Sequence, residues 1–414
     1  MSRPYKIKRT KYTGPVKARP HPLFVVLVVL AVFGLGYLGF VSYTPIYNAI
    51  MNRTQASSQT SPPPQVPEAS IPEEPEEAPP PEPEPAVPEK FRAIYLPAAL
   101  LKDNAALNSF LEGLKDTSLN AVMVDIKDKS GQVLFASQNQ QANKWQAVAP
   151  DAIDLSALAA RLEEQGLSLL VRMSAFRDEM AAREDKQLAV NYRAYGTLWL
   201  DNFQHLGGKP WLNPYSAGAQ QYLLDLALEA VDCGARLVVL DDFCFPPNSM
   251  TGDAFFGDTQ GVSRADVLKS FAQKFEETLS QKEARGAVYL TGAALAGGPN
   301  PTLYGGEAAD IAAGRVLLGA LPYQFSAEGF TSGKLTLRQP LQDPADTVKQ
   351  VANLALQELG DREVIALIQG GVEPQGVSYT AQQIVDQIKA LEELGLEEYV
   401  LYCTDYKAYL LPQS

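Results

Sequence analysis

Histidine and cysteine are scarce in this 414-residue sequence, which contains two histidines and three cysteines. His21 lies in a basic N-terminal segment, so a histidine-based metal site or a Ser-His-Asp triad would depend on His205 alone. We interpret His205 as an ordinary loop residue. The odd number of cysteines, at Cys233, Cys244 and Cys403, favours small buried side chains over a disulfide.

Several cofactor motifs are also missing. No G-x-G-x-x-G run follows the first predicted strand, and no phosphate-binding loop or paired-cysteine motif occurs. The sequence therefore predicts no cofactor and no metal. The formal net charge of −13 argues against nucleic acid as a partner, although much of it comes from a Pro/Glu-rich segment and from helix surfaces.

The longest apolar run spans residues 23–43 and carries no charge. A helix of this length, rising about 1.5 Å per residue, covers the roughly 30 Å hydrocarbon core of a bilayer. Residues 1–22 contain only basic charges, which predicts a cytoplasmic N-terminal tail and an extracellular C-terminal domain. The alternative is a cleaved signal peptide, but the run exceeds the usual apolar core of about 7–15 residues. We expect a single-pass protein of the cell membrane.

Residues 44–90 are dominated towards their end by proline and glutamate and have few apolar residues to bury. Such a segment cannot fold on its own, and its closely spaced prolines favour extended polyproline II. We interpret it as a disordered spacer. A proline-rich ligand for an aromatic groove is the alternative.

Residues 91–414 contain eight short β-rich runs, most of them followed by a helical pattern. The runs are 91–96, 121–126, 168–173, 235–240, 287–290, 315–321, 363–368 and 398–402. Amphipathic helices are predicted at 154–165, 218–231, 263–281, 344–359 and 380–394. Eight alternating units predict a closed (β/α)₈ TIM-like barrel, with an open α/β sheet as the alternative. The fifth helix is weak and the eighth is nearly absent.

Active groups of such barrels lie at the carboxyl ends of the strands. Asp125 and Asp128 follow strand two, and Asp241 directly follows the apolar strand four. Carboxylates that transfer protons and aromatic rings that stack on sugars indicate carbohydrate chemistry. The predicted substrate-binding residues are Lys127, Arg172, Trp199, Trp211, Tyr323, Gln369 and Asp405.

Two runs carry a family resemblance, NAVMVDIKD at 120–128, with Ser130 and Gly131 after it, and LDDFCFP at 240–246. They resemble a bacterial family of glycoside-hydrolase-like proteins with a TIM-barrel domain and no assigned activity. The resemblance spans nearly all of residues 91–409. It implies a carboxylate nucleophile after strand four, which Asp241 matches, and an acid/base after strand five.

The sequence departs from the family pattern at four places. Strand five ends in the neutral run 291–293 where the family carries an aspartate. Cys244 stands where the family usually has an arginine. Asn213 stands where an acid is expected, and Cys403 stands where the family tends to have an asparagine.

The sequence thus predicts a cell-surface glycoside hydrolase acting on a polysaccharide or cell-wall glycan. Asp241 is the expected nucleophile or base, and Asp125 or Asp128 is the expected second carboxylate. The two carboxyl groups could lie about 6.5–9.5 Å apart, the distance found in glycosidases that invert the anomeric centre. Lys127 and Arg172 would tune charge, and Trp199, Trp211 and Tyr323 would be sugar platforms. The alternative is a non-catalytic glycan-binding or envelope scaffold protein on a degenerate barrel.

Overall fold

The computed structural model describes residues 90–192, 196–247, 254–371 and 379–409. The predicted cytoplasmic tail 1–22, the membrane-spanning segment 23–43 and almost all of the spacer 44–90 lie outside the described residues. Within the described part of the chain, no helix is both long and apolar enough to cross a membrane.

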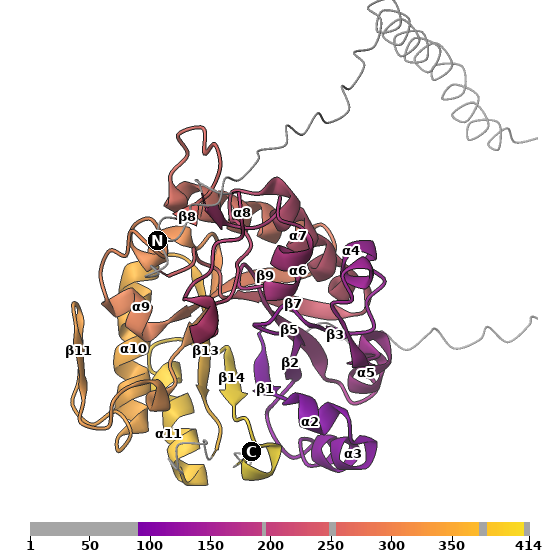
Figure 1. The fold of residues 1–414 in the computed structure, drawn as a ribbon. Helices are drawn as coiled ribbons and strands as arrows, with labels where there is room; N and C mark the ends of the chain where they lie inside the picture. Colours follow the sequence, from indigo (N-terminus) through magenta and orange to yellow (C-terminus); the bar gives the residue numbers. More distant parts are fainter. Residues whose placement is uncertain (1–89, 193–195, 248–253, 372–378, 410–414) are drawn as a thin grey trace, which may run out of the picture. The chain divides into compact units, whose positions relative to one another are not determined.

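Eight parallel strands form a closed ring surrounded by helices (Figure 1). The ring closes because β1 pairs with β2 on one side and with β14 on the other. The predicted barrel is therefore confirmed, and the open sheet is excluded. The strands are β1 Arg92–Tyr95, β2 Ala121–Lys127, β5 Ser168–Ser174, β7 Ala235–Asp241, β9 Arg285–Thr291, β10 Arg315–Gly319, β13 Glu363–Gln369 and β14 Tyr399–Tyr402.

These strands are apolar on both faces because each face packs against protein. On β2, Met123 points into the barrel, and its neighbours Val122 and Val124 pack against the surrounding helices. The same alternation on the other strands fills the barrel interior with apolar side chains. The barrel is thus a packed core, and a site can form only at its ends.

Helices of three turns or more cover the outside where the sequence predicted them. The Asp154, Ser263, Asp343 and Thr380 side chains cap the N-termini of their helices by accepting hydrogen bonds from backbone N–H groups. The α-helices are α2 Ala98–Leu101, α3 Asn104–Glu112, α4 Gln140–Lys144, α5 Leu155–Glu163, α6 Glu179–Glu184, α7 Ala217–Asp232, α8 Arg264–Ser280, α9 Gly292–Ala296, α10 Pro344–Leu359 and α11 Ala381–Glu392.

The fifth and eighth units are short, as predicted. The helix after β9 is α9, with five residues, and the segment after β14 holds the 3₁₀ turn η4 Tyr406–Ala408. The other 3₁₀ turns are η1 Gln204–Leu206, η2 Ala308–Ile311 and η3 Pro322–Gln324.

The second unit carries an extension that the sequence analysis missed. After β2 the chain forms β3 Val133–Phe135, antiparallel to β2, and β4 Val148–Ile153, parallel to β3. These strands extend the sheet outward from the barrel. Two small antiparallel pairs lie elsewhere, β6 Asn191–Tyr192 with β8 Ala254–Phe255, and β11 Phe330–Ser332 with β12 Leu335–Leu337.

A buried ion pair ties the end of β2 to the start of α6. Lys127 Nζ lies 2.9 Å from Asp178 Oδ2, and the two side chains are 1% and 0% exposed. The ammonium also donates to the Ser174 carbonyl at 2.7 Å, and Asp178 Oδ1 caps α6. Gly131 packs directly against the Asp178 carboxylate, so a Cβ at this position would lie 2.0 Å from Asp178 Oδ1. Charge pairing, capping and close packing therefore fix the loop after β2.

Replacing Lys127 by Met should lower the free energy of unfolding by about 3–5 kcal/mol, because it leaves the Asp178 carboxylate buried without its charge partner. Urea unfolding of the purified protein measures the change. The double variant Lys127→Met with Asp178→Asn keeps the cap acceptor and removes the orphaned charge, so it should recover most of the loss. Equal losses in both variants would contradict this account.

Candidate active site

The carboxyl ends of the strands surround a polar layer above the apolar barrel interior. Because side chains alternate along a strand, the position two residues after each inward apolar residue also faces inward. On β7, for example, Val239 belongs to the inner cluster and Asp241 follows at the same parity. The inward residues of this layer are Tyr95, Asp125, Arg172, Asp241, Tyr289, Gln369 and Tyr402.

Asp125 and Arg172 face each other across the β2 and β5 pairing and form a two-pronged ion pair. Arg172 Nε donates to Asp125 Oδ1 at 2.7 Å, and Nη2 donates to Oδ2 at 3.1 Å. Tyr95 Oη also donates to Oδ2, at 2.8 Å. Both carboxylate oxygens are thus held, which fixes Asp125 in one orientation.

The guanidinium of Arg172 also lies near two adjacent aromatic rings, whose centres are 4.8 Å apart. Its carbon is 5.4 Å from the Tyr95 ring centre and 5.6 Å from the Tyr402 ring centre. The negative faces of these rings attract a cation, and a planar guanidinium packs well against them. Arg172 is therefore a fixed positive charge in the mouth of the barrel, and the carboxylates of Asp125 and Asp241 raise its pKa.

Asp241 is half-buried at the end of β7 and accepts a hydrogen bond from the Asp242 N–H at 2.7 Å. Burial raises the pKa of Asp241, and the Asp242 carboxylate adds to the rise. The positive charges of Arg172 and Lys129 act against it. The net result is a carboxyl that keeps its proton to higher pH than an exposed aspartate does.

Asp242 has an unusual backbone conformation, with a φ of 48°. Residues other than glycine rarely adopt positive φ, and such conformations persist where the surroundings fix them. Here Ser174 Oγ donates to Asp242 Oδ2 at 2.8 Å, and Lys129 Nζ lies 3.9 Å from Oδ1. The turn after β7 therefore places two adjacent carboxyl groups at the mouth.

Tyrosines and a cysteine extend the wall beside Asp241. Burial raises the pKa of Tyr289 to about 12, and the charge on Asp241 contributes. Burial also raises the pKa of Tyr304, with Cys244 and Asp241 as the nearest contributing charges. The pKa of Cys244 rises to about 12, chiefly through burial. These groups are neutral near pH 7, so they act as hydrogen-bonding and apolar surface.

The end of β9 delivers no carboxyl group, as the sequence predicted. The hydroxyl of Thr291 caps α9 by accepting from the Ala294 N–H at 3.1 Å. Tyr289 instead fills this part of the mouth, and Gly319 on the next strand makes room for it, since a Cβ there would lie 2.4 Å from the Tyr289 hydroxyl. The fifth barrel strand, β9, therefore contributes the Tyr289 phenol to the wall of the mouth and no carboxyl group.

Two residues expected at the site maintain the loop after β2 instead. Oδ1 of Asp128 accepts hydrogen bonds from the Ser130 and Gln132 N–H groups and from the Ser130 hydroxyl. Lys127 is 2% exposed and pairs with Asp178. Asp128 thus closes the turn, and Lys127 lies beneath the surface of the mouth.

The two tryptophans predicted as sugar platforms lie in the core of the insertion between β5 and α7. Trp199 is 2% exposed and Trp211 is 5% exposed. Trp211 donates through Nε1 to Asp201 Oδ2 at 2.9 Å, and Arg177 lies over its ring. Rings that are this buried have no face open for stacking on a sugar.

The remaining predicted residues lie at the ends of the last three strands. Tyr323 is half-buried and packs against the barrel interior, next to the polar layer. Gln369 is 0% exposed and donates to the Gly371 carbonyl at 3.0 Å. Asp405 is exposed and caps η4. Of the three, Tyr323 has the clearest access to the mouth.

The structure brings Asp125, Arg172 and Asp241 together, and it adds the tyrosines that the sequence analysis missed as site residues. Tyr95, Tyr289 and Tyr402 each lie two residues after an inward-facing apolar residue of the same strand. This pattern can be seen in the sequence once the strands are located. Tyr304 lies in a loop and carried no such signal. Among the described residues, no group of three or more His, Cys, Asp or Glu is arranged to hold a metal ion.

The sequence profile of a family described as "Putative glycosyl hydrolase domain" matches residues 93–407. The chain belongs to this family. The resemblance seen in the motifs at 120–128 and 240–246 is thereby confirmed. A comparison with curated proteins found no match.

Among solved structures, the PgaB (BpsB) glycoside hydrolase domain from Bordetella bronchiseptica is 15% identical, with a TM-score of 0.50 over 77% of this chain and 95% of that one. A hypothetical protein from Ruminiclostridium thermocellum is 22% identical, with a TM-score of 0.41 over 47% of this chain and 96% of that one. An alpha-galactosidase from Thermus thermophilus is 13% identical, with a TM-score of 0.47 over 80% of this chain and 61% of that one. At these identities the likeness concerns the fold alone.

The Asp241→Asn variant should be more stable than the wild type at neutral and mildly alkaline pH. The raised pKa means that the folded state prefers the protonated carboxyl. This contribution is fully present below the unfolded pKa of about 3.9 and is lost as the pH rises through the raised native pKa. Asparagine cannot ionise and avoids the loss.

Thermal unfolding of both proteins across a pH series measures this difference, which should vanish at acidic pH. The exposed Glu163 on α5 supplies a control, because Glu163→Gln should not create a similar pH-dependent gain. A stability difference between the two proteins that does not change with pH would refute the raised pKa.

Proposed function

We propose that the protein is a glycoside hydrolase that cleaves a polysaccharide or cell-wall glycan in the mouth of the barrel. The observation that carries the proposal is the contrast between two carboxyl groups in one site. Asp241 has a raised pKa, whereas Asp125 is held in an ion pair by Arg172. Paired carboxyl groups with different environments are typical of glycosidases, in which one donates a proton and the other acts as an anion.

The raised pKa suits Asp241 to the role of general acid, in place of the nucleophile or base expected from the sequence. Its proton would pass to the glycosidic oxygen as the bond from that oxygen to the anomeric carbon breaks. The Asp125 carboxylate would then stabilise or attack the positive anomeric carbon, or deprotonate the water that adds there. Tyr95 and Arg172 orient Asp125 for either step.

The tyrosines beside these groups supply a surface that suits a sugar. Tyr289, Tyr323 and Tyr402 all pack against the barrel interior, and phenol groups combine an apolar ring with a hydroxyl. The fold likeness to a domain named as a glycoside hydrolase supports the same class of reaction. Tyr402 and Tyr323 are therefore the best candidates for contacts to the sugar ring.

A second candidate function is glycan binding without catalysis, on a barrel that has lost its chemistry. The observation that favours it lies at the end of β9, where Thr291 caps α9 and no carboxyl group is present. Function belongs to the site and not to the fold, so the barrel alone does not distinguish the two.

Hydrolysis decides between these functions. The protein should release reducing ends from at least one polysaccharide in a panel of cell-wall and plant glycans, and Asp241→Asn should abolish release because asparagine cannot donate the proton. Circular dichroism should show that the variant is folded. Binding of a glycan by both proteins without hydrolysis would favour the binding function, and retained hydrolysis in the variant would remove Asp241 from the mechanism.

The pH dependence of kcat/KM tests the acid role of Asp241 in the same experiment. Activity should fall as the pH rises through the raised pKa of Asp241. Asp242→Asn removes a like charge that raises this pKa, so the alkaline limb should move to lower pH. Glu163→Gln should leave the limb in place.

We further propose that the domain works at the outer surface of the cell membrane. The support is the sequence alone, in which basic residues 1–22 precede the uncharged apolar segment 23–43. The full-length protein should remain in the membrane fraction after a high-salt wash, and deletion of residues 23–43 should release it. External protease should digest the C-terminal domain on intact cells. A soluble wild-type protein, or protection from protease, would refute this location.

A further inference from the structure

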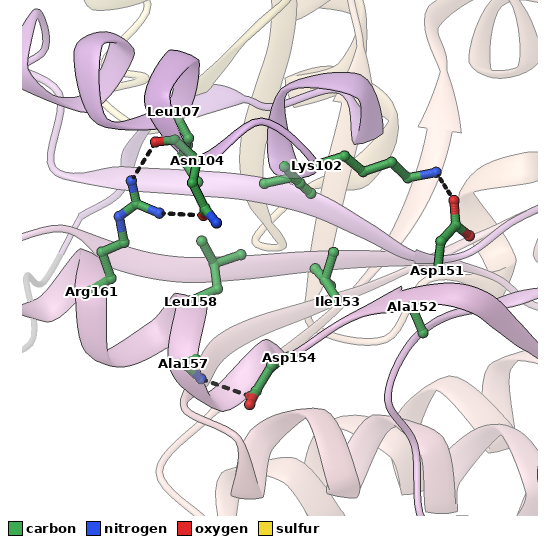
Figure 2. A pocket seen from close by; sticks show the side chains of 11 residues that line it. Lys102, Asn104, Leu107, Asp151, Ala152, Ile153, Asp154, Ala157, Leu158 and Arg161 are labelled. Carbon is green, nitrogen blue, oxygen red and sulfur yellow. Dashed lines mark hydrogen bonds and ion pairs between the residues drawn. The ribbon is translucent and has the colours of Figure 1, made fainter.

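A groove of about 480 Å³ lies beside the mouth, between the first two βα units. Figure 2 shows its lining, which comes from α2, the start of α3, β4 and the start of α5. The β3–β4 extension forms one side of it. Its volume falls within the range of about 300–1,000 Å³ that is typical of ligand sites.

The lining has an apolar middle between two polar ends (Figure 2). Ile153 and Leu158 lie in the middle, and Lys102 pairs with Asp151 at one end. At the other end Arg161 donates to the Asn104 side chain at 3.3 Å and to its carbonyl at 3.2 Å. The groove therefore offers aliphatic surface flanked by hydrogen-bond donors and acceptors.

The charges of the groove balance. The basic residues Lys102 and Arg161 lie with the acidic residues Asp151 and Asp154 in the same lining. A balanced set does not select a strongly charged ligand, because attraction to one pair of groups is offset by repulsion from the other. Neutral sugar units fit this lining, since their hydroxyls pair with both donors and acceptors and their C–H faces pack on aliphatic side chains.

A smaller cavity of about 30 Å³ lies next to the groove. Its lining includes Asp125, the partner of Arg172. It shares Leu101, Lys102, Asp151 and Ile153 with the groove. The shared residues place the two hollows side by side, so the groove lies one small cavity away from Asp125 in the polar layer.

We infer that this groove binds neutral sugar units of a long glycan chain that continues outward from the bond cleaved in the mouth. The inference rests on the proposed function and adds to it a separate binding surface for neutral sugar units. The Lys102 and Asp151 side chains are 50% and 63% exposed, and exposed ion pairs contribute little to stability. A passing chain can therefore displace this pair at small cost.

Binding by the inactive full-length protein tests the inference. Ala157 on α5 is exposed and lines the groove, whereas Ala160 on the same helix is exposed and does not line it. Calorimetric titrations would compare Asp241→Asn alone, with Ala157→Trp and with Ala160→Trp. The probes are the disaccharides and hexasaccharides of the cello-, xylo-, manno- and chito- series.

The hexasaccharide of one series should bind about tenfold or more tightly than its disaccharide, a difference of about 1.4 kcal/mol. Ala157→Trp should remove that gain by filling the groove, and Ala160→Trp should keep it. Thermal unfolding would show whether both variants are folded. Equal affinity for short and long chains, an unchanged gain in Ala157→Trp, or binding of no series would overturn the inference.

The two proposals fail in different ways. Length-dependent binding that is lost in Ala157→Trp, without hydrolysis by the wild type, supports the groove and refutes the hydrolase. Hydrolysis without any length-dependent binding supports the hydrolase and refutes the groove.

Discussion

The mouth of the barrel depends on one buried positive charge, the guanidinium of Arg172. Its two-pronged contact fixes Asp125 on β2, its charge lies near the adjacent rings of Tyr95 and Tyr402, and that charge opposes the rise in the pKa of Asp241. A planar, permanently charged group can make all of these contacts at once, and a lysine ammonium cannot. The residues that surround the proposed site are therefore coupled through a single side chain.

Much of the fold could be predicted because its signals are local. Apolar β-rich runs located all eight barrel strands, and polar residues such as Asp343 and Thr380 marked helix starts that the structure confirms. The β3–β4 extension was missed because Val133–Phe135 has only three residues and Val148–Ile153 contains Pro150 and Asp151, which are uncommon in strands. That extension forms one side of the groove, so the sequence analysis could not locate the groove either.

The site was harder to predict than the fold because a side chain's role depends on its tertiary partners. Asp125 and Asp128 are three positions apart, yet Asp125 faces Arg172 while Asp128 accepts hydrogen bonds from its own turn. Trp199 suggested a sugar platform by residue type, but it packs in the core. Strand parity would have located Tyr289, since the inward face of β9 follows from Ala287. Burial and pairing follow only from the assembled structure.

The distribution of charge over three adjacent strands accounts for the proposed catalytic pair in a barrel without an acid on β9. β2, β5 and β7 are neighbours, and they carry Asp125, Arg172 and Asp241 in that order. Burial and the Asp242 carboxylate raise the pKa of Asp241 although Arg172 opposes the rise, whereas Asp125 pairs directly with Arg172. An acid and an anion can thus coexist on one side of the mouth. The small cavity next to the groove touches Asp125 on β2, so the proposed chemistry and the proposed binding surface lie close together.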